Sequence, residues 1–116
     1  MSDPVGRALT RITRAAGVQG AVVVDAEAGV AVASELAPGV VETALAAMAG
    51  SLFRRTSDAS RTSGFGGVRL LQLDAADGHV LVAGAGSLLV VALTESGAQL
   101  GLVRVEAARA AGELRG

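Results

Sequence analysis

Two glycines in the C-terminal half of the sequence have the spacing of a phosphate-binding loop. The stretch "VAGAGSLLVV" (82–91) places Gly84 and Gly86 two positions apart. A phosphate loop leads into a helix, because the helix N-terminal amides and the helix dipole bind the anion. Here a strand-like run follows, the sequence contains no Lys for a Walker motif, and no third glycine completes a dinucleotide motif. The glycines therefore predict a tight hairpin turn, and we expect no nucleotide or other cofactor.

Few other residues could support acid–base or metal chemistry. His79 is the only histidine and follows a turn, so we expect a solvated surface residue. Two carboxylate pairs, Asp25 with Glu27 and Asp74 with Asp77, occupy loops, where Asp favours turns through local hydrogen bonds. General acid–base catalysis needs a positioned partner group, and the sequence shows none. Cysteine is absent, which excludes thiolate chemistry. We expect no catalytic residue, no metal site and no enzymatic activity.

The pair Arg54-Arg55 is the most prominent charge feature and lies late in an expected helix. It could contact an acidic or phosphate-bearing partner, including as an arginine supplied in trans to a phosphoryl-transfer site. The alternative is a pair of solvated arginines favoured by the dipole near a helix C-terminus. Phe53 is expected on the side of the same helix that faces away from a sheet, where an aromatic side chain can contact a partner. Phe53, Arg54 and Arg55 are the candidate partner-binding residues.

Composition narrows the classes of protein further. Hydrophobic residues make up 51% and charged residues 18% of 116 residues, which predicts one packed domain spanning residues 1–116. With 2% aromatic residues and a net charge of −1, the chain lacks stacking platforms and a basic field, so we expect no nucleic-acid partner. The N-terminus shows no signal-peptide pattern, and the uncharged run 80–94 is shorter than the ~20 residues that span a bilayer. We expect a cytoplasmic protein that does not insert into membranes.

Hydrophobic periodicity predicts an α+β chain with the order α-β-β-α-β-β-β-α. The first helix begins at Asp3-Pro4, carries the stripe Val5, Leu9, Ile12 and Ala16, and ends at Gly17. The second helix is expected from Val40 to about Asp58, and the third carries Leu100, Val103, Ala107, Ala110 and Leu114 on one face. The expected strands are 18–25, 30–33, 68–73, 79–83 and 88–94. Short loops join the last three strands, so we expect them to form an antiparallel meander.

Two stripes run along the expected second helix. One consists of the larger apolar side chains Val41, Leu45, Met48 and Leu52. The other consists of the smaller side chains Val40, Ala44, Ala47 and Ser51. We expect the larger side chains to pack on a sheet and the smaller ones to let a second helix approach closely.

Three segments carry a resemblance to a known family. They are the first hairpin "GVQGAVVVDAEAGVAVAS", the Ala-rich helix "VVETALAAMAGSLFRR" and the segment "DGHVLVAGAGSLLVVALTESGAQLGLVRVEAARAAGEL". In element order and local pattern the chain resembles the Roadblock/LC7 domain family, including the bacterial MglB-like regulators of Ras-like GTPases. The resemblance covers nearly the whole chain and rests on pattern, because the family carries no catalytic signature.

The resemblance implies a profilin-like fold, with a five-stranded antiparallel sheet and the long second helix on one face. It implies a homodimer in which the third strands pair edge to edge and the second helices pack antiparallel. The interface residues would then be Val40, Ala44, Ala47, Ser51, Val68 and Leu70. The implied partner is a small Ras-like GTPase, with Arg54 and Arg55 acting as contacts at most. The alternative is a dimeric scaffold or light-chain-type adaptor in a signalling or motility complex, without effect on GTP hydrolysis.

Overall fold

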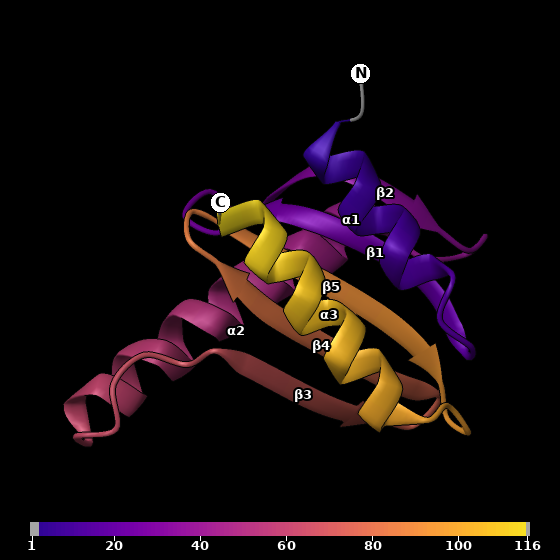
Figure 1. Cartoon of the computed structure of the whole chain (residues 1–116). Coiled ribbons are helices and arrows are strands. Elements are labelled where there is room, and N and C mark those ends of the chain that lie inside the picture. The colour runs from indigo at the N-terminus through magenta and orange to yellow at the C-terminus, as the bar shows by residue number, and fades with distance from the viewer. Residues whose placement is uncertain (1–2, 116) are drawn as a thin grey trace.

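The computed structural model describes residues 3–115 as an antiparallel sheet with helices on both faces (Figure 1). The helices are α1 (Pro4–Thr13), α2 (Glu42–Thr62) and α3 (Leu100–Arg115). The strands are β1 (Val18–Asp25), β2 (Val30–Leu36), β3 (Leu70–Ala75), β4 (Gly78–Ala85) and β5 (Leu88–Glu95). The predicted α+β class and the order α-β-β-α-β-β-β-α are confirmed.

The five strands lie in the order β2-β1-β5-β4-β3, and every neighbouring pair is antiparallel. The predicted meander of β3, β4 and β5 is confirmed, and β2 and β3 form the two edges. Ala85 pairs with Leu88, so Gly86 lies in the two-residue turn between β4 and β5 with φ of 70°. Positive φ is what such hairpin turns require, and glycine supplies it without strain. The Gly84–Gly86 region is therefore the expected hairpin.

Hydrophobic cores form on both faces of the sheet. On one face, α1 packs on β1 and β2 and α3 packs on β4 and β5, and Ile12, Leu81 and Val103 are fully buried there. On the other face, α2 packs against β1 and β5 around Leu45, Val22 and Val91. β1 is buried on both faces from Ala21 to Val24, which explains its continuous apolar run in the sequence.

Helix α1 begins as predicted but ends earlier. Pro4 is the first helical residue, and Asp3 caps the helix by accepting a hydrogen bond from the Val5 N–H at 3.2 Å. Leu9 and Ile12 are buried, which confirms the predicted stripe. The helix ends at Thr13, so Ala16 lies outside it, and Gly17 with φ of 85° belongs to the following turn. A Cβ on Gly17 would lie 2.6 Å from Ala98 Cβ, so the turn passes too close to the β5–α3 loop for a side chain.

Helix α2 packs on the sheet with a face that includes Leu45 of the predicted stripe but is rotated away from Val41 and Met48. The buried residues include Leu45, Ala46, Ala49 and Gly50, whereas Val41 is 63% and Met48 40% exposed. The physical reason is a close approach to the β1–β2 turn. A Cβ on Gly50 would lie only 2.9 Å from Gly29 Cα. Small side chains permit this approach, and the larger ones on the opposite side therefore face outward.

Several element boundaries also differ from the prediction. β2 continues to Leu36 instead of ending at residue 33, and α2 continues to Thr62 instead of about Asp58. Helix α2 begins at Glu42, and Val40 precedes it in a turn that its N–H closes by donating to the Ala37 carbonyl at 3.3 Å. β3 runs from Leu70 to Ala75, so Val68 lies outside the strand. The Val68 N–H donates to Ser57 Oγ on α2 at 3.0 Å, which holds this segment against the helix before the strand begins.

Candidate interaction surface

The outward side of α2 carries a row of apolar and small side chains. Val41, Ala44, Ala47 and Met48 are exposed, and Ser51 is half-buried. Spacings of three and four residues place these side chains on one side of the helix. Of the six predicted interface residues, Ala44, Ala47 and Ser51 therefore lie on this side. Sequence analysis missed Val41 and Met48 because it assigned both to the buried stripe.

Helix α2 covers only part of its face of the sheet. It packs on β1, β2 and β5, and Figure 1 shows its C-terminal half projecting beyond the sheet. On the same face, β3 and β4 carry Leu71, Leu73 and Val80, which are half-buried. These leucine and valine side chains continue the apolar surface of α2 toward the edge of the sheet. We call the two together the α2–β3 surface: Val41, Ala44, Ala47, Met48, Ser51, Leu71, Leu73 and Val80.

The β3 edge borders this surface. Within residues 3–115, β3 pairs only with β4, so its other side offers backbone groups to a further strand. Leu70, an expected interface residue, is half-buried against the core under α1 and α3. Val68 is half-buried beside α2, and Val40 is half-buried against the α2 core. These three residues border the α2–β3 surface without forming its centre.

Phe53 points toward the sheet, so its expected orientation is wrong. Its ring packs, half-buried, against the core between α2 and the sheet. A Cβ on Gly84 would lie 2.9 Å from Phe53 Cζ, so this glycine makes room for the ring. The first glycine of the apparent phosphate loop therefore has a packing role. The orientation of Phe53 could not be predicted from the sequence, because the hydrophobic pattern of an Ala-rich helix only weakly indicates which face is buried.

Arg54 binds the chain's own β1–β2 turn. Its Nη1 donates to the carbonyl oxygens of Ala26 at 2.8 Å and Glu27 at 2.9 Å. Asp25 Oδ1 accepts the N–H groups of Glu27 and Ala28 in the same turn, as expected for a carboxylate with a local structural role. Arg55 is exposed. The two arginines thus differ: Arg54 fastens α2 to the hairpin, and Arg55 is available on the helix surface.

Replacing Arg54 with Ala is expected to lower the free energy of unfolding by about 1 kcal/mol, because it removes two hydrogen bonds from a charged donor at an exposed site. Amide hydrogen exchange should accelerate in the β1–β2 turn. Arg55→Ala is the matched control and should leave both quantities unchanged. Equal effects of the two substitutions would contradict the assignment of Arg54 to the turn.

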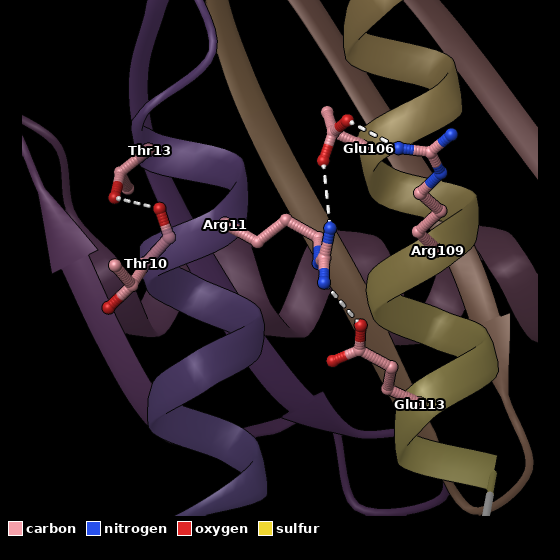
Figure 2. A network of polar contacts seen from close by, with 6 residues as sticks. All are labelled: Thr10, Arg11, Thr13, Glu106, Arg109 and Glu113. Atoms are coloured by element: carbon pink, nitrogen blue, oxygen red, sulfur yellow. Dashed lines mark hydrogen bonds and ion pairs between the residues drawn. The ribbon is translucent and has the colours of Figure 1, made fainter.

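An ion-pair network joins α1 to α3 on the opposite face of the sheet (Figure 2). Arg11 contacts Glu106 Oε2 through Nη1 at 3.5 Å and Glu113 Oε1 through Nη2 at 2.6 Å. Arg109 contacts the other Glu106 oxygen at 3.4 Å. Arg11, Glu106 and Glu113 line an open groove of about 1220 Å³. No local sequence signal indicated that Arg11 would join two glutamates of α3.

His79 is more constrained than a solvated surface residue. Its Nδ1 lies 2.7 Å from Asp74 Oδ1, and its Nε2 lies 3.2 Å from the Ser96 carbonyl oxygen. The hydrogen bond to Asp74, followed by that to Ser96, raises the pKa of His79 above its ordinary value. Hydrogen bonds from Gln72 and His79 lower the pKa of Asp74. Ser96 contributes its carbonyl and not its hydroxyl, so this contact differs from the nucleophile contact of a hydrolase triad.

The imidazolium form of His79 can donate from both ring nitrogens, so we expect its NMR titration midpoint to lie above 6.5. Because the pKa is higher in the folded chain, the stabilisation is fully present below pH 6.5 and is lost as pH rises through the raised pKa. In Asp74→Asn the midpoint should fall back toward 6.5. A midpoint that this substitution does not move would contradict the pairing.

Other kinds of site receive no support from the described part of the chain. Within residues 3–115, no group of three or more His, Cys, Asp or Glu side chains could hold a metal ion. None of the described helices is long and apolar enough to cross a membrane. An apolar helix face beside a free strand edge, by contrast, is typical of a protein-interaction domain.

Comparison with known proteins gives the family. The Roadblock/LC7 domain model matches residues 5–93, and the chain belongs to this family. Two uncharacterized proteins of Methanocaldococcus jannaschii are similar over 112 residues. One is 33% identical, over 96% of this chain and 93% of its own length, and the other is 30% identical, over 96% of each. Both of these relatives are archaeal, whereas the resemblance described above included bacterial regulators.

Solved structures show the same fold. Myxococcus xanthus MglB has a TM-score of 0.85 at 20% identity, over 96% of this chain and 91% of that one. A Roadblock/LC7 domain from Streptomyces avermitilis has a TM-score of 0.82 at 19% identity, over 94% and 92%. The gliding protein MglB of Thermus thermophilus has a TM-score of 0.83 at 22% identity, over 99% and 90%. The expected Roadblock/LC7 fold is confirmed.

Proposed function

We propose that this chain is a non-enzymatic homodimeric regulator of a small Ras-like GTPase in the cytoplasm. The observation that carries the proposal is the α2–β3 surface, an apolar helix face next to an unpaired strand edge. Membership of the Roadblock/LC7 family supports it, since the resemblance implies dimers that bind such GTPases.

A dimer would cover the exposed apolar side chains of the α2–β3 surface and pair the free backbone groups of β3. Closed two-fold dimers are the commonest homo-oligomers, and a helix that packs on its own copy across an axis perpendicular to it does so antiparallel. Small side chains at Ala44, Ala47 and Ser51 allow two helices to approach closely, with Val41 and Met48 contributing apolar contact. Pairing of the two β3 strands would satisfy the free backbone groups at the edge.

The GTPase is proposed to contact the dimer near α2. Arg55 is exposed on α2 one turn after Ser51, so in the proposed dimer it lies beside the helix crossing, where it can attract a carboxylate or phosphate of a partner bound over the helix pair. Arg54 already binds the Ala26 and Glu27 carbonyl oxygens, which argues against an arginine inserted into the GTPase site. Regulation would then proceed by positioning the GTPase's own residues.

The test is GTP turnover by the Ras-like GTPase encoded nearest in the genome, with and without this protein, with binding of its GTP-analogue-loaded form followed on the same samples. Faster hydrolysis, reduced by Arg55→Ala but not by Arg109→Ala on the opposite face, is the expected result. If the protein binds the GTPase without changing its GTP turnover, it does not regulate hydrolysis and acts instead as an effector or scaffold. Absence of binding would contradict the proposal for that GTPase.

A dimeric scaffold is the second candidate function. On α3, which packs on the face opposite α2, Leu102 is 57% and Val105 46% exposed. A dimer joined through α2 would keep these apolar side chains accessible on both protomers, so it could hold two further partner molecules. Loss of partner binding in Leu102→Ser without loss of the dimer would support this function.

A further inference from the structure

Phe65 is the most exposed large apolar side chain described in the chain, at 87% exposure. It is one of only two aromatic residues in the sequence, and the other, Phe53, packs against a core. Aromatic side chains are enriched among the residues that contribute most to protein–protein binding. An ordered Phe projecting into solvent is therefore a candidate anchor for a partner.

The loop that carries Phe65 has a defined conformation. Gly64 and Gly66 on either side have φ of 91° and 80°, which glycine adopts without strain. The Phe65 N–H donates to the Ser60 carbonyl oxygen at 3.0 Å, and the Gly64 N–H donates to the Arg61 carbonyl at 3.0 Å. These bonds fold the chain back on the last turn of α2, as in a helix C-terminal motif. Phe65 therefore sits near the level of the last helical turn.

The position of this loop points to a second copy of the chain. The C-terminal half of α2 projects beyond its own sheet (Figure 1), and Phe65 follows this end of the helix by three residues. Ser51 lies midway along the exposed side of α2 between Ala44 and Asp58. If two α2 helices cross antiparallel there, a residue ten positions after Ser51 in one copy faces a residue ten positions before it in the other. At ~1.5 Å per residue each lies about 15 Å from the crossing point.

Those positions are Arg61, at the level of Phe65, and Val41, which is 63% exposed. We propose that Phe65 of each protomer packs on Val41 of its partner, so that two symmetric Phe–Val contacts close the ends of the α2 pair. This inference rests on the proposed dimer and adds its register. The contact would cover the exposed side chains of Phe65 and Val41. It extends the α2–β3 surface, of which Val41 is a member.

Disulfide trapping tests the register directly, because the chain contains no native cysteine. Val41 and Phe65 lie at opposite ends of the 21-residue helix α2, so one chain cannot bridge them and any disulfide must join two chains. The double variant Val41→Cys/Phe65→Cys is expected to form a covalent dimer under mild oxidation. Ala108→Cys/Phe65→Cys is the matched control, because Ala108 is exposed on α3, and it should form far less covalent dimer.

A second variant measures the contribution of the contact. Phe65→Ser should raise the dimer dissociation constant by about tenfold or more, because each dimer loses two anchors. Leu102→Ser, also an exposed apolar residue, should leave it unchanged. Both variants should keep the wild-type circular-dichroism spectrum, since neither side chain is buried in the protomer.

The outcomes separate this inference from the dimer itself. Sedimentation reports the dimer, and Ser51→Cys reports the helix crossing through its own disulfide. A dimer that Ser51→Cys traps but Val41→Cys/Phe65→Cys does not, with wild-type affinity in Phe65→Ser, overturns the proposed register and leaves the dimer intact. A monomeric wild-type protein overturns the proposed dimer and this inference together.

Discussion

Replacing Met48 with Glu is expected to convert the proposed dimer into monomers while leaving the protomer folded. Met48 is 40% exposed and lies on the α2–β3 surface near the proposed crossing of the two helices. A carboxylate there would be removed from water without a partner, and the two-fold axis would bring two such charges close together. We expect the dissociation constant to rise by about a hundredfold or more, measured by sedimentation velocity over a range of concentrations.

Ala108→Glu is the matched control for this prediction. Ala108 is exposed on α3, on the opposite face of the sheet, so the added charge is the same but the location differs. This variant should remain a dimer. If Met48→Glu remains dimeric while Ala108→Glu dissociates, the interface lies on the α1–α3 face and the assignment of α2 is wrong.

Replacing Gly78 with Ala is expected to lower the free energy of unfolding by about 3 kcal/mol or more, the upper end of the usual cost of inserting atoms into packed structure. A Cβ on Gly78 would lie 2.1 Å from the carbonyl oxygen of Thr94. Gly78 pairs with Glu95 at the end of the β4–β5 ladder, so the oxygen belongs to backbone that the ladder holds in place. Urea unfolding followed by circular dichroism measures the loss.

The control for Gly78 is Gly97→Ala. A Cβ on Gly97 would meet no atom within 4 Å, so we expect a change within about 0.5 kcal/mol. A wild-type stability for Gly78→Ala would mean that β4 and β5 can separate at this end without cost. That result would contradict the close approach of the two strands.

The sequence predicted the sheet well because its strands are apolar runs bounded by turn residues. Val18–Asp25 and the three-strand meander lie where the β-branched runs and the Asp77-Gly78 turn placed them, although β3 begins two residues later than expected. That shift arises from a long-range contact, the hydrogen bond from Val68 to Ser57, which no local pattern encodes.

Helix α2 shows where sequence patterning fails. Its periodicity supported a helix, but the buried face was assigned to the larger side chains. Gly50 instead lies against Gly29 of the β1–β2 turn, where only a small residue fits. With Gly50 on the inner side of α2, Met48 faces outward and Phe53 faces the sheet. Of the six interface residues that the resemblance implies, Ala44, Ala47 and Ser51 lie on the outer side of α2, where a second copy could contact them.

The polar contacts between residues far apart in the sequence could not be predicted. Arg54 and its carbonyl partners are separated by more than 25 positions, and Arg11 and Glu113 by more than 100. In the sequence Arg54 was a candidate partner contact or a solvated charge, and nothing indicated a role for Arg11. Only the fold shows that one fastens α2 to the first hairpin and the other joins α1 to α3.

The most direct test of the account is the distance between two copies of α2. A spin label on Asp58→Cys, at an exposed position of α2, would be measured by double electron–electron resonance in the assembled protein. Antiparallel helices about 8–10 Å apart that cross at Ser51 predict a narrow distribution at about 20–35 Å. Absence of an intermolecular distance, or one beyond about 45 Å, would place α2 outside the interface and contradict the central claim.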